Sequence, residues 1–348
     1  MKNAPIYPLL FEPIYKEKIW GGRRLEDLGR SLPGAPDLTI GESWELVDLG
    51  QTDVSGGGGQ EERSIVANGP LAGHTLHQMM TLFGKQLLGN LKPNEFGEFP
   101  LMVKFLDADE NLSLQVHPSR AYAQTHAEAF LKSESWYIVD ATPNSFIYKG
   151  VQEGVTPDQF RRALEQHDLE PLLVKIPARP GDCHYLPSGT CHALGAGVLV
   201  AEVQTPSDTT FRVFDWGRSG RQLHVKQALE CIEFGPPKVD RFEKRTRIKG
   251  DQTISTRLIR CEYFHIDHIE AASGFEQKLN PHQPMIWVVL EGGGCISIHG
   301  HHGRDEIEFK RGQTMLIPPA LSGGHLDLNH ETTWLQITLP QAIPTRMA

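Results

Sequence analysis

One spacing occurs twice in this chain of 348 residues, and it constrains the fold more than any other feature. The segments 181–187 and 312–318 each start with glycine and end with proline, with five residues between them. In each segment a turn glycine leads into a short apolar strand that stops at the proline, and a further strand follows at 198–204 or 333–339. Such self-similarity is typical of a duplicated unit, so we expect two copies of one β-barrel.

The rest of the chain also favours β-structure. Its 34 glycines and 24 prolines separate short alternating apolar runs, and long helical stretches are rare. Apolar residues recur at helical spacing from His74 to Leu88, and two further helices are expected from Thr156 and over Val225–Phe234. The glycines after Glu291 predict a hairpin within Met285–Ile298, and Gly56–Gly59 predicts a surface loop.

We therefore expect a mainly β fold of two jelly-roll barrels with a helical insertion in the amino-terminal part. The first domain would span residues 1–240, with the insertion at about 68–92, and the second would span 241–348. The charged segment 236–250, which is poor in apolar residues, is the predicted junction.

Charge and hydropathy exclude several kinds of partner. The formal charge is -9 and no basic cluster occurs, so neither nucleic acid nor an anionic membrane is an expected partner. No apolar run reaches the ~18 to 20 residues that a membrane span needs, and no signal peptide core follows the first residues. Five scattered cysteines without a CxxC pair suggest reduced thiols. These features predict a cytoplasmic protein with a small-molecule partner.

A candidate site begins with the strict alternation of residues 112–117. On a strand, Ser113, Gln115 and His117 would face one side and three apolar residues the other. Glu134 begins the next strand and His192 follows the first Gly–Pro segment, so two histidines, a carboxylate and an amide could bind Zn²⁺ or another first-row metal. The alternative is that His117, just before a proline, is merely exposed at a strand end.

Two charged residues are expected at strand centres. Glu202 shares a face with apolar residues of 198–204, and Arg212 shares one with Thr210 and Phe214. Because buried charge is costly unless it is paired or coordinated, these residues either form a structural ion pair or line a polar cavity.

Several separated motifs resemble one known family. They are the string from Lys104 to Pro118 that contains Ser113, Gln115 and His117, the segments Pro187–Ala193 and Glu202–Arg212, and amino-terminal matches around Trp20 and Trp44. Over about residues 8–218 these resemble the type I mannose-6-phosphate isomerases in their short bacterial form. The Gly181–His192 spacing is also similar to a metal-binding motif of the cupin superfamily, so the two barrels are expected to be cupin-type.

The resemblance implies a site and an activity. Gln115, His117, Glu134 and His192 would hold one zinc ion per chain, Arg212 would be an active-site cation, and Ser113, Lys132, Glu202 and Trp20 would line the site for a sugar phosphate. The expected reaction interconverts mannose 6-phosphate and fructose 6-phosphate through an enediol. Glu202 is the candidate base, and Arg212 or Lys132 would stabilise negative charge on the enediolate or the phosphate.

The second barrel departs from this pattern. His325 lies seven residues after Pro318, whereas His192 lies five residues after Pro187, and no Gln-x-His strand precedes it, so no metal is expected there. A monomer or a homodimer is expected. Two alternatives remain open from the sequence, namely an iron-dependent cupin oxygenase and a non-catalytic sugar-binding cupin.

Overall fold

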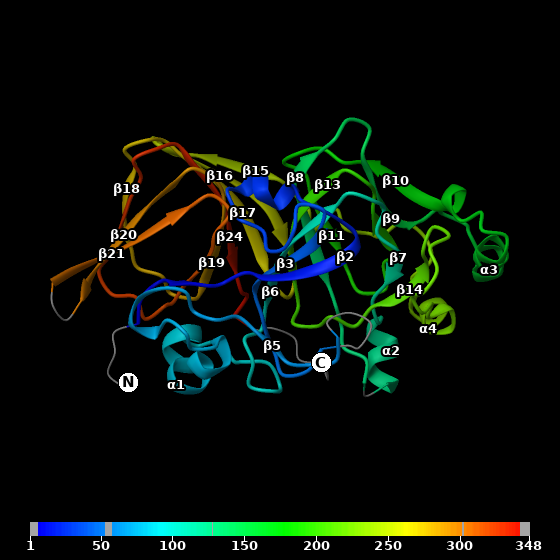
Figure 1. Ribbon diagram of the computed structural model, residues 1–348, viewed down its shortest axis with the longest axis horizontal. Helices are drawn as coiled ribbons and strands as arrows, with labels where there is room; N and C mark the ends of the chain where they lie inside the picture. The colour runs from blue at the N-terminus through cyan, green and yellow to red at the C-terminus, as the bar shows by residue number, and fades with distance from the viewer. Residues whose placement is uncertain (1–5, 53–57, 127, 301–302, 342–348) are drawn as a thin grey trace.

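The computed structural model describes residues 6–52, 58–126, 128–300 and 303–341, and its β-strands build two pairs of sheets that lie side by side (Figure 1). In the first pair, one sheet contains, in spatial order, β11 (Cys183–Leu186), β8 (Glu134–Ala141), β13 (Val198–Gln204), β6 (Met102–Ala108), β2 (Ile14–Gly22) and β3 (Ile40–Leu46). The facing sheet contains β10 (Leu173–Pro177), β9 (Phe146–Val151), β12 (His192–Leu194), β7 (Leu114–Val116) and β14 (Phe211–Phe214).

The second pair is built mostly from the carboxy-terminal third of the chain. Its larger sheet contains β1 (Leu9–Leu10), β22 (Thr314–Ile317), β19 (Met285–Glu291), β24 (Thr332–Thr338), β17 (His265–Ala271), β16 (Thr253–Arg260) and β15 (Thr246–Lys249). Its smaller sheet contains β18 (Glu276–Leu279), β23 (Gly324–Asp327), β20 (Gly293–Gly300) and β21 (Gly303–Lys310). The short strands β4 (Asp48–Leu49) and β5 (Glu62–Arg63) pair with each other. The mainly β fold expected from the sequence is confirmed.

Strand β13 shows how the layers pack. Leu199, Ala201 and Val203 belong to a core cluster shared with the larger sheet of the second pair, while Val198 and Val200 pack into the space between the sheets of the first pair. Because side chains alternate across a strand, β13 is buried on both faces. The sheet that contains β13 is therefore the central layer of the molecule.

The repeated Gly–Pro segments occupy matching places in the two pairs. Gly181 and Gly312 both adopt left-handed backbone, with φ of 88° and 81°, before β11 and β22. Each of these strands is followed by one strand in the facing sheet and then by a central strand, β13 or β24. Strand β1 pairs with β22, so Leu9 and Leu10 join the second pair of sheets. The domain boundary at residue 240 remains a prediction.

The helices follow local capping signals. Helix α1 (Leu76–Leu88) begins after Thr75, whose side chain forms a capping box with Gln78, and it buries the apolar face expected from the sequence. Helix α3 (Pro157–Glu165) begins in the same way at Thr156, whereas α4 (Val225–Cys231) ends three residues earlier than expected. The remaining helical segments are α2 (Arg120–Thr125) and short 3-10 turns at Arg24–Leu28, Gly69–Leu71 and Glu170–Leu172.

The hairpin predicted around Glu291 is wrong. Strand β19 pairs with β22 and β24, whereas β20 pairs with β21 and β23 in the other sheet. Gly292 has a φ of 72°, and a Cβ atom at Gly293 would lie 2.4 Å from the carbonyl oxygen of Phe309. The glycines therefore let the chain cross from one sheet to the other. Of the predicted loop Gly56–Gly59, residues 56 and 57 lie outside the described residues, and Gly58 and Gly59 adopt left-handed backbone.

Candidate metal centre

Three neighbouring strands of the first pair's smaller sheet place polar side chains side by side. Gln115 at the centre of β7 lies opposite His192 of β12 on one side and opposite Arg212 of β14 on the other. Residues that face each other across antiparallel strands project to the same side of the sheet. Gln115, His192 and Arg212 therefore share one wall of the space between the sheets.

A β-bulge changes the face of one predicted residue. The register between β14 and β7 shifts after Arg212, so that Phe214 lies opposite Leu114 and packs with the apolar cluster behind the sheet. The expectation that Phe214 shares a face with Arg212 is wrong, because the extra residue of a bulge reverses the alternation.

The facing sheet supplies the opposite wall. Glu202 on β13 lies between Lys104 of β6 and Trp136 of β8, and Gln204 of β13 lies opposite Glu134. The indole Nε1 of Trp136 donates a hydrogen bond to Glu202 Oε2 at 2.8 Å. Two carboxylates and a cation thus enter the same space from consecutive strands.

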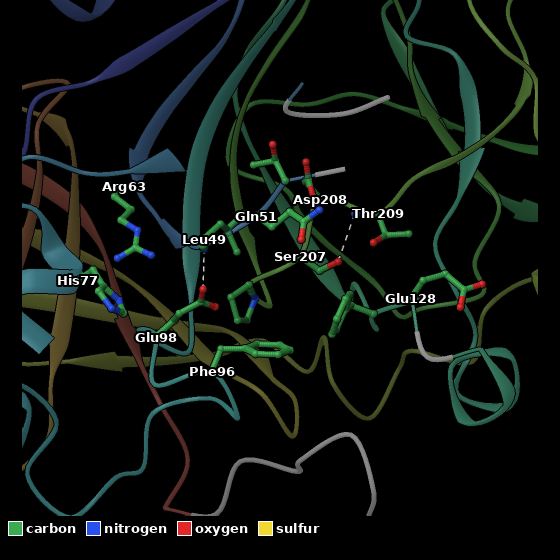
Figure 2. A pocket seen from close by; sticks show the side chains of 14 residues that line it. Leu49, Gln51, Arg63, His77, Phe96, Glu98, Glu128, Ser207, Asp208 and Thr209 are labelled. Atoms are coloured by element: carbon green, nitrogen blue, oxygen red, sulfur yellow. Dashed lines mark hydrogen bonds between the residues drawn. The ribbon is translucent and has the colours of Figure 1, made fainter. Parts of the chain in front are cut away.

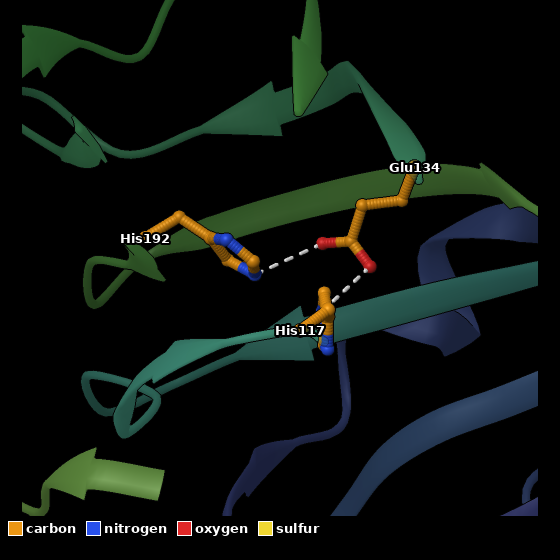
Figure 3. Close-up of side chains that lie close together, drawn as sticks. All are labelled: His117, Glu134 and His192. Atoms are coloured by element: carbon orange, nitrogen blue, oxygen red, sulfur yellow. Dashed lines mark ion pairs between the residues drawn. The ribbon is translucent and has the colours of Figure 1, made fainter. Parts of the chain in front are cut away.

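His117, Glu134 and His192 converge at one end of this space (Figure 3). The Nε2 atoms of the two histidines each lie 3.1 Å from a different oxygen of the Glu134 carboxylate. All three side chains are fully buried, with exposed fractions of 0 to 1%. The expectation that His117 is merely exposed at a strand end is therefore wrong.

The backbone determines which nitrogen of each histidine faces Glu134. His117 Nδ1 lies 2.9 Å from the carbonyl oxygen of Thr209, and His192 Nδ1 lies 2.8 Å from that of Thr190. A carbonyl oxygen can only accept, so each Nδ1 carries the proton and donates it. Burial, followed by the charge of Lys132, lowers the pKa of His117 to about 3, so the ring is neutral and its Nε2 lone pair is available.

Lys132 lies against the same group of atoms. Its Nζ is 3.1 Å from His117 Nε2 and forms an ion pair with Glu134 Oε2. Burial alone would raise the pKa of the Glu134 carboxyl, but the charge of Lys132, followed by the interactions with His117 and His192, outweighs burial and holds that pKa well below its ordinary range. Glu134 is thus an ionised carboxylate that already attracts a cation.

The donor set fits a metal ion of the zinc type. It combines two imidazoles, each oriented by a carbonyl, with a carboxylate whose Oε1 is buried and accepts no hydrogen bond from the described residues. The three ligand atoms lie within 4.8 Å of one another. Gln115 Nε2 lies 3.3 Å from His192 Nε2, and rotating the amide by 180° would present its oxygen instead, as a fourth donor.

A cavity of about 240 Å³ opens beside this cluster. Gln115 and Lys132 line it and also contact the cluster, so these two side chains separate the cavity from the buried histidines. The other predicted residues that line it are Trp20, Ser113, Glu202 and Arg212. Sequence reasoning thus selected residues that the fold brings together.

Sequence reasoning missed six charged residues of this cavity. They are Glu17, Lys18, Glu42, Lys104, Asp208 and Arg221. Lys18 pairs with Glu42 at 3.2 Å, and despite the opposing effect of burial the charges of Lys18 and Lys104 lower the pKa of Glu42 to about 2. Lys104 belongs to the string of residues that resembles the family, and it lies two residues before Leu106 on strand β6. Residues two apart on a strand face the same side, so this spacing could have placed Lys104 on the cavity side.

Glu202 and Arg212 line the cavity from opposite sheets. Glu202 forms ion pairs of 3.9 Å with Lys104 and with Lys132, while Arg212 Nη1 donates to the carbonyl oxygen of Gln222 at 2.8 Å. Of the two expectations for this pair, the polar cavity is therefore the one that the structure supports. Burial and the nearby Glu134 raise the pKa of Glu202 above its ordinary value of 4.5.

A larger cavity of about 750 Å³ is lined in part by the segment 206–209 (Figure 2). Arg63, His77, Phe96 and Glu98 are among its lining residues, and Asp208 borders both cavities. None of the site residues predicted from the sequence lines it, so volume alone does not identify the chemical centre.

The second pair of sheets also contains a histidine near carboxylates. His325 Nε2 lies 3.2 Å from Asp327 and 3.6 Å from Glu276. These side chains are 29 to 68% exposed, and exposed acidic groups of this kind commonly lack a metal.

The paired sheets and the enclosed histidine–glutamate group define a cupin-type β protein with a candidate metal centre. The family model for the catalytic domain of type I phosphomannose isomerase matches residues 9–142. Mannose-6-phosphate isomerase ManA of Bacillus subtilis is 34% identical over 326 residues, covering 90% of this chain and 94% of that protein. The mannose-6-phosphate isomerase of Streptococcus mutans is 31% identical over 327 residues, covering 92% and 95%. The chain therefore belongs to the type I mannose-6-phosphate isomerases.

Solved structures agree with this assignment. The crystal structure of the mannose 6-phosphate isomerase from Bacillus subtilis superimposes with a TM-score of 0.81 at 30% identity, covering 96% of this chain and all of that one. A mannose 6-phosphate isomerase bound with zinc and yttrium has a TM-score of 0.69 at 15% identity, which shows a shared fold. Among the described residues, no helix combines the length and the apolar character needed to cross a membrane.

Proposed function

We propose that this chain is a zinc-dependent isomerase that interconverts mannose 6-phosphate and fructose 6-phosphate. The observation that carries the proposal is the buried His117–Glu134–His192 group beside a cavity lined by lysine, arginine and glutamate, in a chain of this family. An aldose–ketose isomerase must move a proton between C1 and C2 of the open-chain sugar. It therefore needs a base, stabilisation of the enediolate and a grip on the phosphate.

One zinc ion per chain is part of the proposal. His117, Glu134, His192 and Gln115 would hold it, and when bound it would act as a Lewis acid that polarises the carbonyl or hydroxyl oxygen of the sugar. The supporting observations are the neutral imidazole of His117 and the carboxylate oxygen of Glu134 that accepts no hydrogen bond from the described residues.

Glu202 is the proposed base. It would take the proton from one carbon and return it to the neighbouring carbon of the enediolate. Its buried position, with a pKa above the ordinary 4.5, brings the carboxylate closer to the operating pH and makes it a stronger base. The hydrogen bond from Trp136 orients one oxygen and leaves the other beside the two lysines.

Lys132 and Arg212 are the proposed catalytic cations. Lys132 lies between the candidate metal ligands and Glu202, where its charge would stabilise negative charge developing on the enediolate oxygens. Arg212 enters from the facing sheet beside Gln115 and would donate hydrogen bonds to the same intermediate. Trp20 and Ser113 would contact the sugar, since both line the cavity.

A coupled assay of mannose 6-phosphate conversion tests the proposal. It is run on purified protein analysed for metal, then after chelation and after zinc is added back. We expect activity to disappear on chelation and to return with zinc. Absence of activity in protein that holds stoichiometric zinc would contradict the proposal and favour a sugar-binding protein, and bound iron would favour an oxygenase. A cytoplasmic location and a monomeric or homodimeric state complete the proposal, and cell fractionation and analytical ultracentrifugation test them.

A further inference from the structure

The loop that follows β14 contains two arginines that share one buried carboxylate. Asp215 is 3% exposed, and both Arg218 and Arg221 donate hydrogen bonds to it. One buried carboxylate therefore holds two guanidinium groups, and of the two only Arg218 has a second carboxylate partner among the described residues, Glu110 at 3.2 Å. The guanidinium of Arg221, which shares its single carboxylate partner, can still attract an anion to the mouth of a neighbouring cavity.

The two arginines differ in how many guanidinium nitrogens remain without a hydrogen-bond partner. All three guanidinium nitrogens of Arg218 are engaged, with Asp215, Glu110 and the carbonyl oxygen of Asn111. Arg221 uses its Nε, 2.8 Å from Asp215 Oδ2, and its Nη2 in a side-on pair with the carboxylate. Its Nη1 has no hydrogen-bond partner among the described residues, and Arg221 alone of the two lines the cavity beside the metal centre.

The loop is tied to the catalytic arginine. Arg212 Nη1 donates to the carbonyl oxygen of Gln222 at 2.8 Å, and the backbone N–H of His224 donates to the carbonyl oxygen of Arg212, also at 2.8 Å. Arg221, the residue before Gln222, is thereby held next to Arg212 on the same border of the cavity. Asp215 and these two bonds fix its guanidinium before any ligand arrives.

The substrate has two ends with different needs. Its carbonyl end must reach the side of the cavity where Gln115 and Lys132 contact the candidate metal ligands, and Lys132 is engaged there with Glu134. Its phosphate end then needs a cation elsewhere on the cavity wall. A preorganised guanidinium with donors to spare suits a phosphate, since guanidinium groups bind phosphate oxygens with two parallel hydrogen bonds.

We propose that Arg221 binds the phosphate of the sugar substrate and that Asp215 is the positioning residue that aims its guanidinium into the cavity. This inference rests on the proposed isomerase function and names the group that selects phosphorylated sugars. Lys132 and Arg212 are then left to act on the enediolate.

The test compares two single substitutions of the same kind. Arg221→Gln should raise KM for mannose 6-phosphate about tenfold or more and weaken competitive inhibition by inorganic phosphate in parallel, with kcat within about threefold of the parent. Arg218→Gln, which removes an arginine bound to the same Asp215 but outside the cavity, should leave KM and phosphate inhibition within about twofold. Equal increases of KM in both variants would overturn the proposal, because they would indicate loss of loop structure.

Two further variants distinguish the contact of Arg221 with the phosphate from the positioning of Arg221 by Asp215. Arg221→Lys keeps the charge but cannot form two parallel hydrogen bonds, so KM should lie between those of the parent and Arg221→Gln. Asp215→Asn keeps the shape and removes the charge that orients Arg221, so KM should rise while kcat changes less. Unchanged KM in Asp215→Asn would refute the positioning role. Thermal unfolding of each variant confirms that the protein is folded.

Calorimetry of fructose 6-phosphate and of fructose keeps this inference distinct from the proposed function. The parent should bind the phosphorylated sugar more tightly, and Arg221→Gln should lose that preference whether or not isomerisation occurs. Failure of isomerisation with a preserved Arg221 effect would count against the proposed function alone. An active isomerase in which Arg221→Gln keeps the full preference for phosphate would count against this inference alone.

Discussion

His117 Nδ1 donates a hydrogen bond to the carbonyl oxygen of Thr209 at 2.9 Å, and this contact leaves His117 Nε2 directed at Glu134. Thr209 lines the larger cavity, so a backbone carbonyl beside that cavity determines which nitrogen of His117 can bind a metal. His192 uses the carbonyl of Thr190 in the same way. A histidine whose second nitrogen is anchored like this is typical of metal ligands.

The first prediction concerns the metal ligands. His117→Ala and His192→Ala should each abolish stoichiometric zinc binding and activity, because each removes one of three clustered donors. Elemental analysis of the purified variants and the coupled assay measure both effects. His325→Ala is the matched control and should change neither metal content nor activity, and full zinc retention in either active-site variant would show that the ligand assignment is wrong.

The second prediction concerns Arg212. Arg212→Ala should retain the metal and lose turnover, because this cation borders the cavity but lies outside the group of candidate ligands. Steady-state kinetics and metal analysis on the same preparation test this. Activity within about tenfold of the parent, or ~1.4 kcal/mol of barrier, would mean that Arg212 is structural.

The third prediction concerns the base. Glu202→Gln should lower kcat by about 10² to 10⁴, the usual contribution of a general base, while the metal content stays the same. Because the carboxylate must be ionised to accept a proton, and burial raises its pKa, kcat/KM of the parent should fall on the acid side through a pKa above 4.5. The pH profile of kcat/KM measures this. An acid limb that persists unchanged in residual Glu202→Gln activity would assign it to another group.

The fourth prediction concerns the stability of the protein and the carboxyl group of Asp107, which has no proposed role in the reaction. Burial raises the pKa of Asp107 from 3.8 to about 6, although the backbone N–H of Arg24 donates to its Oδ2 at 2.7 Å. Between these values the folded protein binds more protons than the unfolded chain, so its free energy of unfolding falls as the pH rises.

Asp107→Asn removes this titration and keeps an oxygen acceptor for Arg24. The free energy of unfolding of the variant relative to the parent should therefore increase by about 2.4 kcal/mol from pH 4 to pH 7. Urea unfolding across that range measures the difference, with the value at pH 4 as the internal reference. A constant difference would show that folding leaves the pKa of Asp107 unchanged.

Local signals in the sequence predicted local structure well. Thr75 and Thr156 start helices where their hydroxyls cap the first turn, and Gly181 and Gly312 start equivalent strands. The same local reasoning was wrong at Gly292, where a glycine turn that resembles a hairpin instead carries the chain into another sheet. A glycine-rich turn can either close a hairpin or carry the chain from one sheet to another, and its composition is the same for both. Only the strands with which β19 and β20 pair show which of the two occurs here.

At the candidate site, too, the sequence identified some residues and missed others. The residue types of Gln115, His117, Glu134 and His192, and the family that they resemble, could be identified from the sequence because they occur in specific short motifs. Glu42 and Arg221 were missed because nothing in their immediate neighbours marks them as lining a cavity.

The sequence by itself determined the residue types, the strand periodicity and the duplicated unit. These features can be recognised within short segments of the chain, because strand alternation and turns depend on residues that are close in sequence. Only the tertiary structure decided that Glu202 faces two lysines, that Phe214 turns away from Arg212, and that Arg221 reaches the cavity while Arg218 does not. These outcomes depend on the register between strands that are far apart in the chain. One residue of slip reverses the face of every side chain, so register is set by packing of the whole sheet.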